Sequence, residues 1–271
     1  MMKDISIGRY YNGKSVLHRL DPRVKVLLFI VYMVTIFMAN TPVAMLATFA
    51  VVLVLALLSK IPVMEILRSV RPIVFIMIFI FVLNLFSIRQ GDVLWSWKFL
   101  VITSGGLMRA VLLAFRLLLL ILATSLLLSL TTTPLKLSDA LESLGSPLKV
   151  IKVPVNEMAM TMSIALRFIP TLVEETDKIM KAQSSRGAEY DTGNIFHRAQ
   201  GYVTVLVPLF VSAFKRAEEL AIAMDSRCYR GGVGKTKLHP LKMKTKDYLW
   251  MLALVILAVV PLAVDFLWKI K

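Results

Sequence analysis

Cysteine, histidine and charged residues are all scarce in this chain. Cys228 is the only cysteine among 271 residues, so an intramolecular disulfide is excluded. Three histidines occur, too few and too scattered for a Cys/His metal site. Charged residues make up 18% of the chain and hydrophobic residues 58%, against about 25% and about 45–50% in soluble domains. This excess of apolar side chains excludes an ordinary soluble enzyme, a disordered tail and a nucleic-acid module, and it predicts a polytopic membrane protein.

Long apolar runs recur along the chain, and a helix needs about 20 such residues to cross a bilayer. The predicted spans are Val24–Ala39, Val43–Leu58, Pro72–Ile88, Leu107–Leu130 and Tyr248–Trp268. Between them we predict a polar loop with a short helix at 60–71 and an interfacial loop at 89–105 that contains Trp95 and Trp97. The fold class is therefore all-α, with about five transmembrane helices. Residues 1–130 hold four of them, 131–246 form a separate polar region, and 247–271 form the last.

Positive residues predict the orientation across the membrane. The chain has 32 Lys+Arg against 17 Asp+Glu, a net charge of +15, which in a soluble protein would suggest nucleic-acid binding. In a membrane protein, Lys and Arg gather on the cytoplasmic side instead. Cations precede or begin the first predicted span and separate the second from the third: Lys3, Arg9, Lys14, Arg19, Arg23, Lys25, Lys60, Arg68 and Arg71. We therefore predict a cytoplasmic N-terminus, a cytoplasmic 131–246 region and an outside C-terminus, although Lys269 and Lys271 count against the last point.

The 131–246 region contains two long amphipathic helices in the prediction. A short helix, Pro134–Leu144, and a brief connector at 149–152 precede them. Apolar residues recur every three or four positions, as one face of a helix requires. They are Met158, Met162, Leu166, Ile169, Val173, Ile179 and Met180 in the first helix, and Val203, Val207, Phe210, Phe214, Ala217, Ala221 and Met224 in the second. These faces must pack on each other, on the spans or on other chains, and the dense methionines suit either a core or a surface that accepts varied partners. Pro170 and Pro208 are expected to bend the two helices.

The two amphipathic helices end in the same way. The first ends with Ser185-Arg186-Gly187 and the second with Ser226-Arg227-Cys228, within a shared Ala-x-x-Ser-Arg pattern. A cation in a last helical turn is favoured by the helix dipole, so each arginine could be a simple cap in solvent. Alternatively, small neighbours leave the guanidinium uncovered, and it could enter a cleft on another protein to make bidentate contacts. The repetition favours the second interpretation.

With these paired tips the sequence resembles the T component of energy-coupling factor (ECF) transporters, which are ABC-type vitamin importers. The opening segment Tyr10–Arg23 and the order of spans, with the amphipathic insert before the last one, also resemble that family. The resemblance covers nearly the whole chain. The family's tripeptides are commonly Ala-Arg-Gly, so Ser185 and Ser226 are nearly isosteric changes. Cys228 in place of glycine is the larger departure.

The resemblance implies a non-catalytic scaffold in the bacterial cell membrane. Two cytoplasmic ATPase subunits would each receive one helix tip, formed by Ser185, Arg186 and Gly187 or by Ser226, Arg227 and Cys228. The spans would hold a substrate-binding membrane protein, the S component, and ATP-driven movement of the helices would reorient it. ATP and Mg²⁺ would be bound by the ATPases, which leaves this chain with no cofactor, no metal and no nucleic-acid partner of its own. The sequence does not identify the vitamin.

Other functional classes make different demands on the sequence. A stand-alone secondary transporter or channel would show paired intramembrane charges, broken helices and repeated halves. An ordinary ABC permease would usually carry one coupling element rather than two. A membrane enzyme would need acid, base and nucleophile groups converging in a cavity, and none is evident.

Three further features of the sequence are candidate sites. Residues 230–236 read like a phosphate loop, but a helix precedes them and Tyr229 stands where glycine is required, so we predict a linker. Arg109 and Arg116 share a face of the fourth span, either snorkelling and pairing internally or contacting the S component or a water-filled cavity. His18 and Asp21 suggest structure rather than catalysis, and His197 and His239 lack neighbours at metal-ligand spacing.

Overall fold

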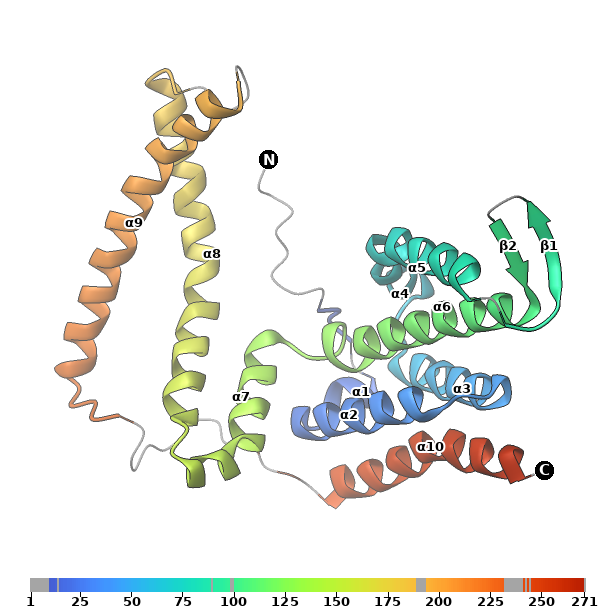
Figure 1. Ribbon diagram of the computed structural model, residues 1–271. Coiled ribbons are helices and arrows are strands. Elements are labelled where there is room, and N and C mark those ends of the chain that lie inside the picture. Colours follow the sequence, from blue (N-terminus) through green and yellow to red (C-terminus); the bar gives the residue numbers. More distant parts are fainter. Residues whose placement is uncertain are drawn as a thin grey trace. The chain divides into compact units, whose positions relative to one another are not determined.

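The computed structural model describes residues 10–13, 15–88, 90–97, 100–188, 194–231, 241, 243 and 245–270 (Figure 1). Its contacts divide the chain into two compact units. We call residues 8–140 with 241–271 the membrane unit, and residues 141–240 the insert unit. The helices are α1 (Val16–Arg19), α2 (Pro22–Met38), α3 (Pro42–Ser59), α4 (Val63–Val70), α5 (Val74–Ser87), α6 (Ser104–Thr124), α7 (Pro134–Leu144), α8 (Val155–Ser185), α9 (Ile195–Asp225) and α10 (Thr245–Ile270). The all-α class and the polytopic membrane architecture are thereby confirmed.

Four segments of the described chain are long and apolar enough to cross a membrane. They are Pro42–Ser59, Val63–Ser87, Ser104–Ser129 and Asp247–Trp268. The first predicted span corresponds to α2, which has 17 residues and is therefore about 26 Å long. That is slightly less than the ~30 Å of a hydrocarbon core, so a crossing by α2 stays a prediction.

Local sequence explains where α2 and α3 begin. Each has proline in its first turn, where the missing N–H removes no helical hydrogen bond. The Asp21 carboxylate accepts a hydrogen bond from the Arg23 backbone N–H at 2.8 Å. The Thr41 hydroxyl accepts one from Ala44 N–H at 3.3 Å. The turn between these helices is therefore a pair of adjacent helix ends.

Two connections differ from the sequence prediction. The short helix expected within the polar loop at 60–71 is α4, but it does not stand apart: α4, a 3₁₀ turn at Arg71–Ile73 and α5 follow one another and together form the candidate span Val63–Ser87. Proline at the second position of the 3₁₀ turn is compatible with this path, and Glu65 and Arg68 pair at 2.9 Å on the helix surface. The expected loop at 89–105 contains an antiparallel hairpin of β1 (Val93–Trp97) and β2 (Leu100–Thr103). The side chains of Trp95 and Trp97 lie outside the described part of the structure.

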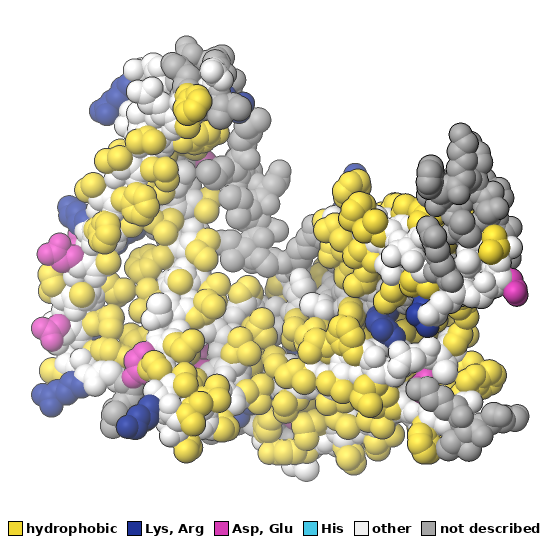
Figure 2. All heavy atoms as spheres, in the orientation of Figure 1, with side chains coloured by type: hydrophobic (Ala, Val, Ile, Leu, Met, Phe, Trp, Pro, Cys, Tyr) yellow, Lys and Arg dark blue, Asp and Glu magenta, His cyan; other side chains and the backbone are white. Residues whose placement is uncertain are grey.

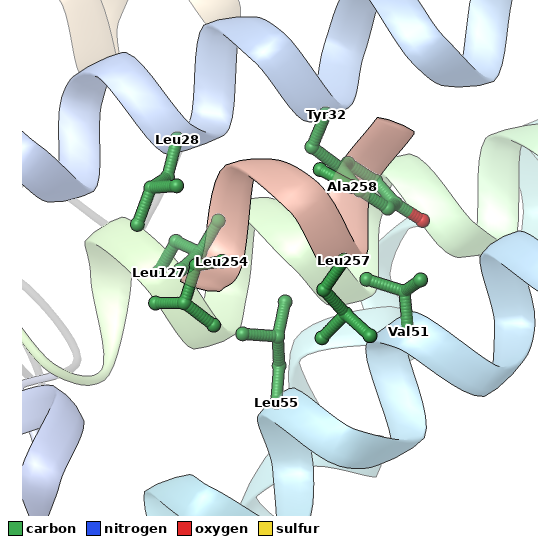
Figure 3. A pocket seen from close by; sticks show the side chains of 8 residues that line it. All are labelled: Leu28, Tyr32, Val51, Leu55, Leu127, Leu254, Leu257 and Ala258. Carbon is green, nitrogen blue, oxygen red and sulfur yellow. The ribbon is translucent and has the colours of Figure 1, made fainter. Parts of the chain in front are cut away.

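The core of the membrane unit lies between α2, α3, α6 and α10, which run side by side (Figure 1). A π-helical turn, Ser125–Ser129, completes α6, so the predicted span Leu107–Leu130 is confirmed as one helical run. Figure 3 shows a small cavity in this core, of about 10 Å³, which is room for roughly one water molecule. Its lining is apolar: Leu28, Tyr32, Val51, Leu55, Leu127, Leu254, Leu257 and Ala258. The cavity is too small to hold a transported organic molecule.

The insert unit contains the two predicted amphipathic helices. Both α8 and α9 have 31 residues, so each is about 46 Å long. The predicted helix Pro134–Leu144 matches α7, and a 3₁₀ turn at Ser146–Ile151 leads toward α8. Pro170 and Pro208 lie inside the helices, and both helices continue past them. The bends expected at these prolines stay a prediction.

Candidate functional site

The end of α8 forms a compact cap that presents Arg186. The Arg186 N–H donates to Gln183 O at 3.0 Å, Gly187 N–H to Ser184 O at 3.0 Å, and Ala188 N–H to Gln183 O at 3.0 Å. Gly187 adopts a left-handed backbone with φ of 88°. This arrangement is a Schellman-type end, in which a left-handed residue turns the chain back and satisfies the last carbonyl groups.

The end of α9 repeats the same cap 41 residues later. Arg227 N–H donates to Met224 O at 3.2 Å, Cys228 N–H to Asp225 O at 2.8 Å, and Tyr229 N–H to Met224 O at 3.1 Å. Cys228 takes the left-handed conformation with φ of 54° that glycine takes in the first cap. The departure from glycine at this position is therefore compatible with the same pattern of capping hydrogen bonds.

Both tips leave their arginine uncovered. All six tip residues are exposed: Ser185, Arg186, Gly187, Ser226, Arg227 and Cys228. The serine hydroxyls bond back to their own helices, Ser185 to Lys181 O and Ser226 to Ala223 O, both at 3.0 Å. Within the described ranges, neither guanidinium is held by a side chain of this protein. The geometry therefore allows both arginines to reach into another molecule.

Substitutions of the left-handed residues Gly187 and Cys228 are expected to have opposite effects on the two caps. We expect Gly187→Ala to destabilise the α8 cap by about 1 kcal/mol, because a Cβ is strained at positive φ. We expect Cys228→Gly to stabilise the α9 cap by a similar amount. Hydrogen exchange at the Ala188 and Tyr229 amides measures both effects. Equal shifts of the same sign would contradict this account.

The two tips lie at opposite ends of the helix pair. Figure 1 shows α8 and α9 running in opposite directions, close together where α8 ends and α9 begins. Arg186 follows α8 near the start of α9, whereas Arg227 follows the far end of α9. About 46 Å of helix therefore separates the tips, which is enough room for two separate partner subunits.

A polar contact fixes α8 against α9. The Glu175 carboxylate accepts hydrogen bonds from the Ser212 hydroxyl and from the Arg216 guanidinium, and it forms an ion pair with Arg216. A groove of about 380 Å³ lies beside this contact, lined also by Thr171, Glu174, Lys178, Ile179 and Ala182. The Ser212 hydrogen bond, together with the Arg216 charge, lowers the pKa of Glu175 below its ordinary value.

The lowered pKa of Glu175 predicts how the stability of the α8–α9 pairing changes with pH. A carboxylate with a depressed pKa stabilises the folded pairing above its unfolded pKa, near 4.5, and this contribution is lost as the pH falls through the folded pKa. We expect the protection of α9 amides, corrected for intrinsic exchange, to fall below about pH 4.5 in the wild-type chain. Glu175→Gln should remove most of this pH dependence. The exposed Glu218→Gln should keep it, and an equal loss in both variants would refute the assignment.

The apolar stripe of α9 faces away from α8. Successive helical residues are about 100° apart, so Val205, Ser212 and Arg216 share the side that contacts α8. Val205 is buried on that side, whereas Phe210 and Phe214 on the opposite side are 60% and 73% exposed. Figure 2 shows hydrophobic side chains along the visible face of α9. Of the alternatives left open by the sequence, packing of this stripe on α8 is therefore wrong.

Arg116 in the membrane unit bonds inside the protein. Its guanidinium donates to Ala39 O at 2.6 Å and to Asn40 Oδ1 at 3.4 Å, in the turn between α2 and α3. Asp265 of α10 holds the same turn, accepting from Asn40 N–H at 3.3 Å, Thr41 N–H at 3.0 Å and the Thr41 hydroxyl at 2.6 Å. The two side chains of opposite charge therefore complete one polar corner. Arg109, about two turns earlier on α6 and predicted to share a face with Arg116, is exposed.

The remaining sequence candidates contribute no site among the described residues. Positions 232–236 of the phosphate-loop-like segment, the side chain of His197 and the whole of His239 lie outside them. His18 bonds locally, with its Nδ1 2.7 Å from the Ser15 hydroxyl and its Nε2 2.9 Å from Tyr11 O. Among the described residues, no group of three His, Cys, Asp or Glu side chains lies close enough together to hold a metal ion.

Sequence reasoning missed the polar corner and the Glu175 contact. In the sequence Asp265 stands near the end of the last predicted span, and its partner Thr41 lies 224 residues away. Glu175 stands beside Glu174 and Asp177 before the first tip. The helical spacing of Ser212 and Arg216 on one side of α9 was the available signal, but it does not identify a partner.

Comparison with known proteins gives consistent matches. A family model described as "CbiQ: Cobalt transport protein" matches residues 13–239. The chain is 51% identical to a protein of Ruminiclostridium cellulolyticum over 92% of both chains. It is 47% identical to one of Acidaminococcus fermentans over 100% of this chain and 99% of the relative. It is 44% identical to a Bacillus subtilis protein, in an alignment that covers 95% of this chain and 97% of the relative. All three relatives are named "Energy-coupling factor transporter transmembrane protein EcfT".

Proposed function

The chain belongs to the CbiQ/EcfT family and is a transmembrane component of an energy-coupling factor transporter, and from this premise we propose that it couples ATP hydrolysis to vitamin uptake. Two cytoplasmic ATPase subunits would drive it, and a membrane-embedded S component would bind the vitamin. The chain itself would carry out no chemistry. ATP and Mg²⁺ would be held by the ATPases.

The single observation that carries this proposal is the pair of exposed arginine tips with the same capping pattern. A guanidinium presents its donors in a planar fork that fits a carboxylate or two carbonyl groups. Each tip is fixed by three backbone hydrogen bonds, so little conformational freedom is lost when it docks. Two matching tips at opposite ends of one helix pair suit two related ATPase subunits.

The exposed stripe of α9 supports a second contact. Val203, Val207, Phe210 and Phe214 form a continuous apolar face on a helix outside the predicted spans. A contiguous apolar surface of this kind marks an interaction site, because exposure to water is unfavourable. We assign it to contact with the S component. Helix movement driven by the ATPases would then be delivered directly to the substrate-binding subunit.

Of the two arginines of α6, only Arg109 is proposed to contact the S component. Arg116 is engaged by the turn between α2 and α3, which supports an internal structural role. Arg109 is exposed and stays the candidate for contact with the S component or with lipid headgroups. Orientation follows the charge distribution: a cytoplasmic N-terminus and insert unit, with the C-terminus outside.

The proposal is tested by purifying the tagged chain in mild detergent and identifying the associated chains by mass spectrometry. We expect two ABC ATPase polypeptides, or one ATPase in two copies, and at least one small polytopic membrane protein. Reconstitution of the chain alone and of the whole complex into liposomes completes the test. Uptake by the chain alone would instead support a secondary transporter or channel. Recovery of ATPases without a separate binding subunit would support an ordinary ABC permease.

A further inference from the structure

Two chain connections join the insert unit to the membrane unit. The chain leaves the membrane unit after Ala140, beyond the end of α6, and returns at Leu241, ahead of α10. Any displacement carried along the backbone between the units passes through these two connections. The contacts that hold these two connections within the membrane unit therefore determine how much of that displacement reaches the spans.

The first turn of α2 holds both connections. The Lys25 ammonium donates to Thr131 O at 2.8 Å and to the Thr132 hydroxyl at 3.1 Å. The Arg23 guanidinium donates to Leu241 O at 3.1 Å. One turn of one helix thus binds the outgoing and the returning segment, which are more than 100 residues apart in the sequence.

The buried ammonium group of Lys25 requires hydrogen-bond acceptors around it. Lys25 is 1% exposed, and a buried ammonium group is tolerated only when acceptors surround it. Thr131 and Thr132 follow directly on the helical run of α6 and the π-helical turn, where carbonyl groups lack partners within the helix. A cation at this end is also favoured by the helix dipole. Lys25 therefore caps the helical run immediately before α7 begins at Pro134.

Two further residues of the opening segment stabilise the contact between the start of α2 and the end of α6. Asp21 is buried and caps α2 through the Arg23 backbone N–H, which fixes the turn that carries Arg23 and Lys25. Tyr11 N–H donates to Leu130 O at 3.0 Å, one residue before Thr131. The opening segment of the chain is thus folded onto the exit of α6.

We propose that Arg23 and Lys25 are positioning residues that clamp both connections, so that movement of the insert unit is transmitted to the membrane spans. The inference rests on the proposed coupling function and extends it to residues remote from both arginine tips. Without the clamp, the segments around Thr131 and Leu241 would absorb the displacement by local motion. The complex would still assemble and hydrolyse ATP, but hydrolysis would drive little transport.

The test compares Lys25→Met, Arg23→Gln and the double variant in the complete complex, reconstituted in proteoliposomes. Arg19→Gln is the matched control, because Arg19 is an exposed cation of the same opening segment. ATP hydrolysis is measured together with uptake of radiolabelled riboflavin, folate, biotin and thiamine, supplied in turn. Hydrogen exchange of 130–144 is followed in parallel, with α3 as an internal reference.

We expect the double variant to lower uptake per ATP hydrolysed at least ten-fold, with normal recovery of the ATPases. Exchange at 130–144 should rise while α3 stays protected. The inference would be overturned if uptake per ATP hydrolysed or hydrogen exchange at 130–144 were unchanged in the double variant. An equal loss of uptake per ATP in Arg19→Gln would also overturn it. Failure of the junction variants to assemble would overturn it too, by showing a folding role instead. Absence of ATPases from the wild-type preparation would overturn the proposed function, and this coupling role with it.

Discussion

Replacing Arg186 and Arg227 together by glutamate is expected to abolish co-purification of the ATPase subunits with this chain. Each substitution removes a guanidinium that would be desolvated on docking and places a carboxylate against the groups that received it. Losing one desolvated charged contact costs about 2–5 kcal/mol, or roughly 30- to 5,000-fold in affinity. Repulsion adds to this figure. ATP-dependent uptake by reconstituted vesicles should fall to background.

The charge reversal is separable from damage to the helices. Both caps are built from backbone hydrogen bonds, and both arginine side chains are exposed, so the variant should fold normally. Arg167→Glu combined with Arg230→Glu gives the same change in charge at two exposed positions outside the tips. Normal ATPase binding by the tip variant, or equal loss in the control, would rule out the docking role.

Single tip variants refine the same experiment. If each tip serves a different ATPase subunit, either substitution alone should weaken one attachment while the other stays intact. The remaining attachment should still retain ATPase when the two subunits bind each other. We therefore expect partial recovery of ATPase with single variants but nearly complete loss of uptake, because both helices must be driven.

Asp265→Ala is expected to destabilise the membrane unit by about 1–3 kcal/mol, the usual cost of leaving buried hydrogen-bond donors without their acceptor. The carboxylate is 5% exposed and accepts three hydrogen bonds from Asn40 and Thr41. Its removal leaves those donors without the acceptor that holds them. The turn between α2 and α3 would then lose its attachment to α10.

The loss is measured as the thermal midpoint of the detergent-solubilised protein. Asp92→Ala, which removes an exposed carboxylate near the hairpin, should leave the midpoint within a degree or two. Asp265→Asn keeps one acceptor oxygen but not the charge, and it should fall between the wild type and Asp265→Ala. A midpoint for Asp265→Ala equal to that of the control would contradict the role of this corner.

Helix positions were largely readable from the sequence because they depend on neighbours along the chain. Long apolar runs placed α2 and α3, and the 3.6-residue spacing placed α8 and α9, within a few residues of their ends. The hairpin at 93–103 was missed because apolar and aromatic residues suit an interfacial loop and a strand pair equally well. The join of α4 to α5 was missed because polar residues between apolar runs resemble a loop, although Glu65 and Arg68 pair along one helix surface.

The arginine tips were also predictable, since each depends on the last turn of a single helix. Partners across the fold were not. Arg116 was recognised as a charge that needed a partner, but the oxygen atoms it contacts belong to a turn 76 to 77 residues earlier. Lys25 was counted only as a cation that sets orientation, although it is buried against the end of α6.

The sequence by itself determined the membrane class, the order of helices and the two exposed tips, because hydrophobic period, capping residues and helix ends act over a few neighbouring residues. Tertiary structure alone decided which side of α9 faces α8, which turn Arg116 and Asp265 share, and which connections Arg23 and Lys25 hold. These contacts join residues tens to hundreds of positions apart. Many acceptors along the chain could satisfy the same cation, and only packing of the helices selects among them.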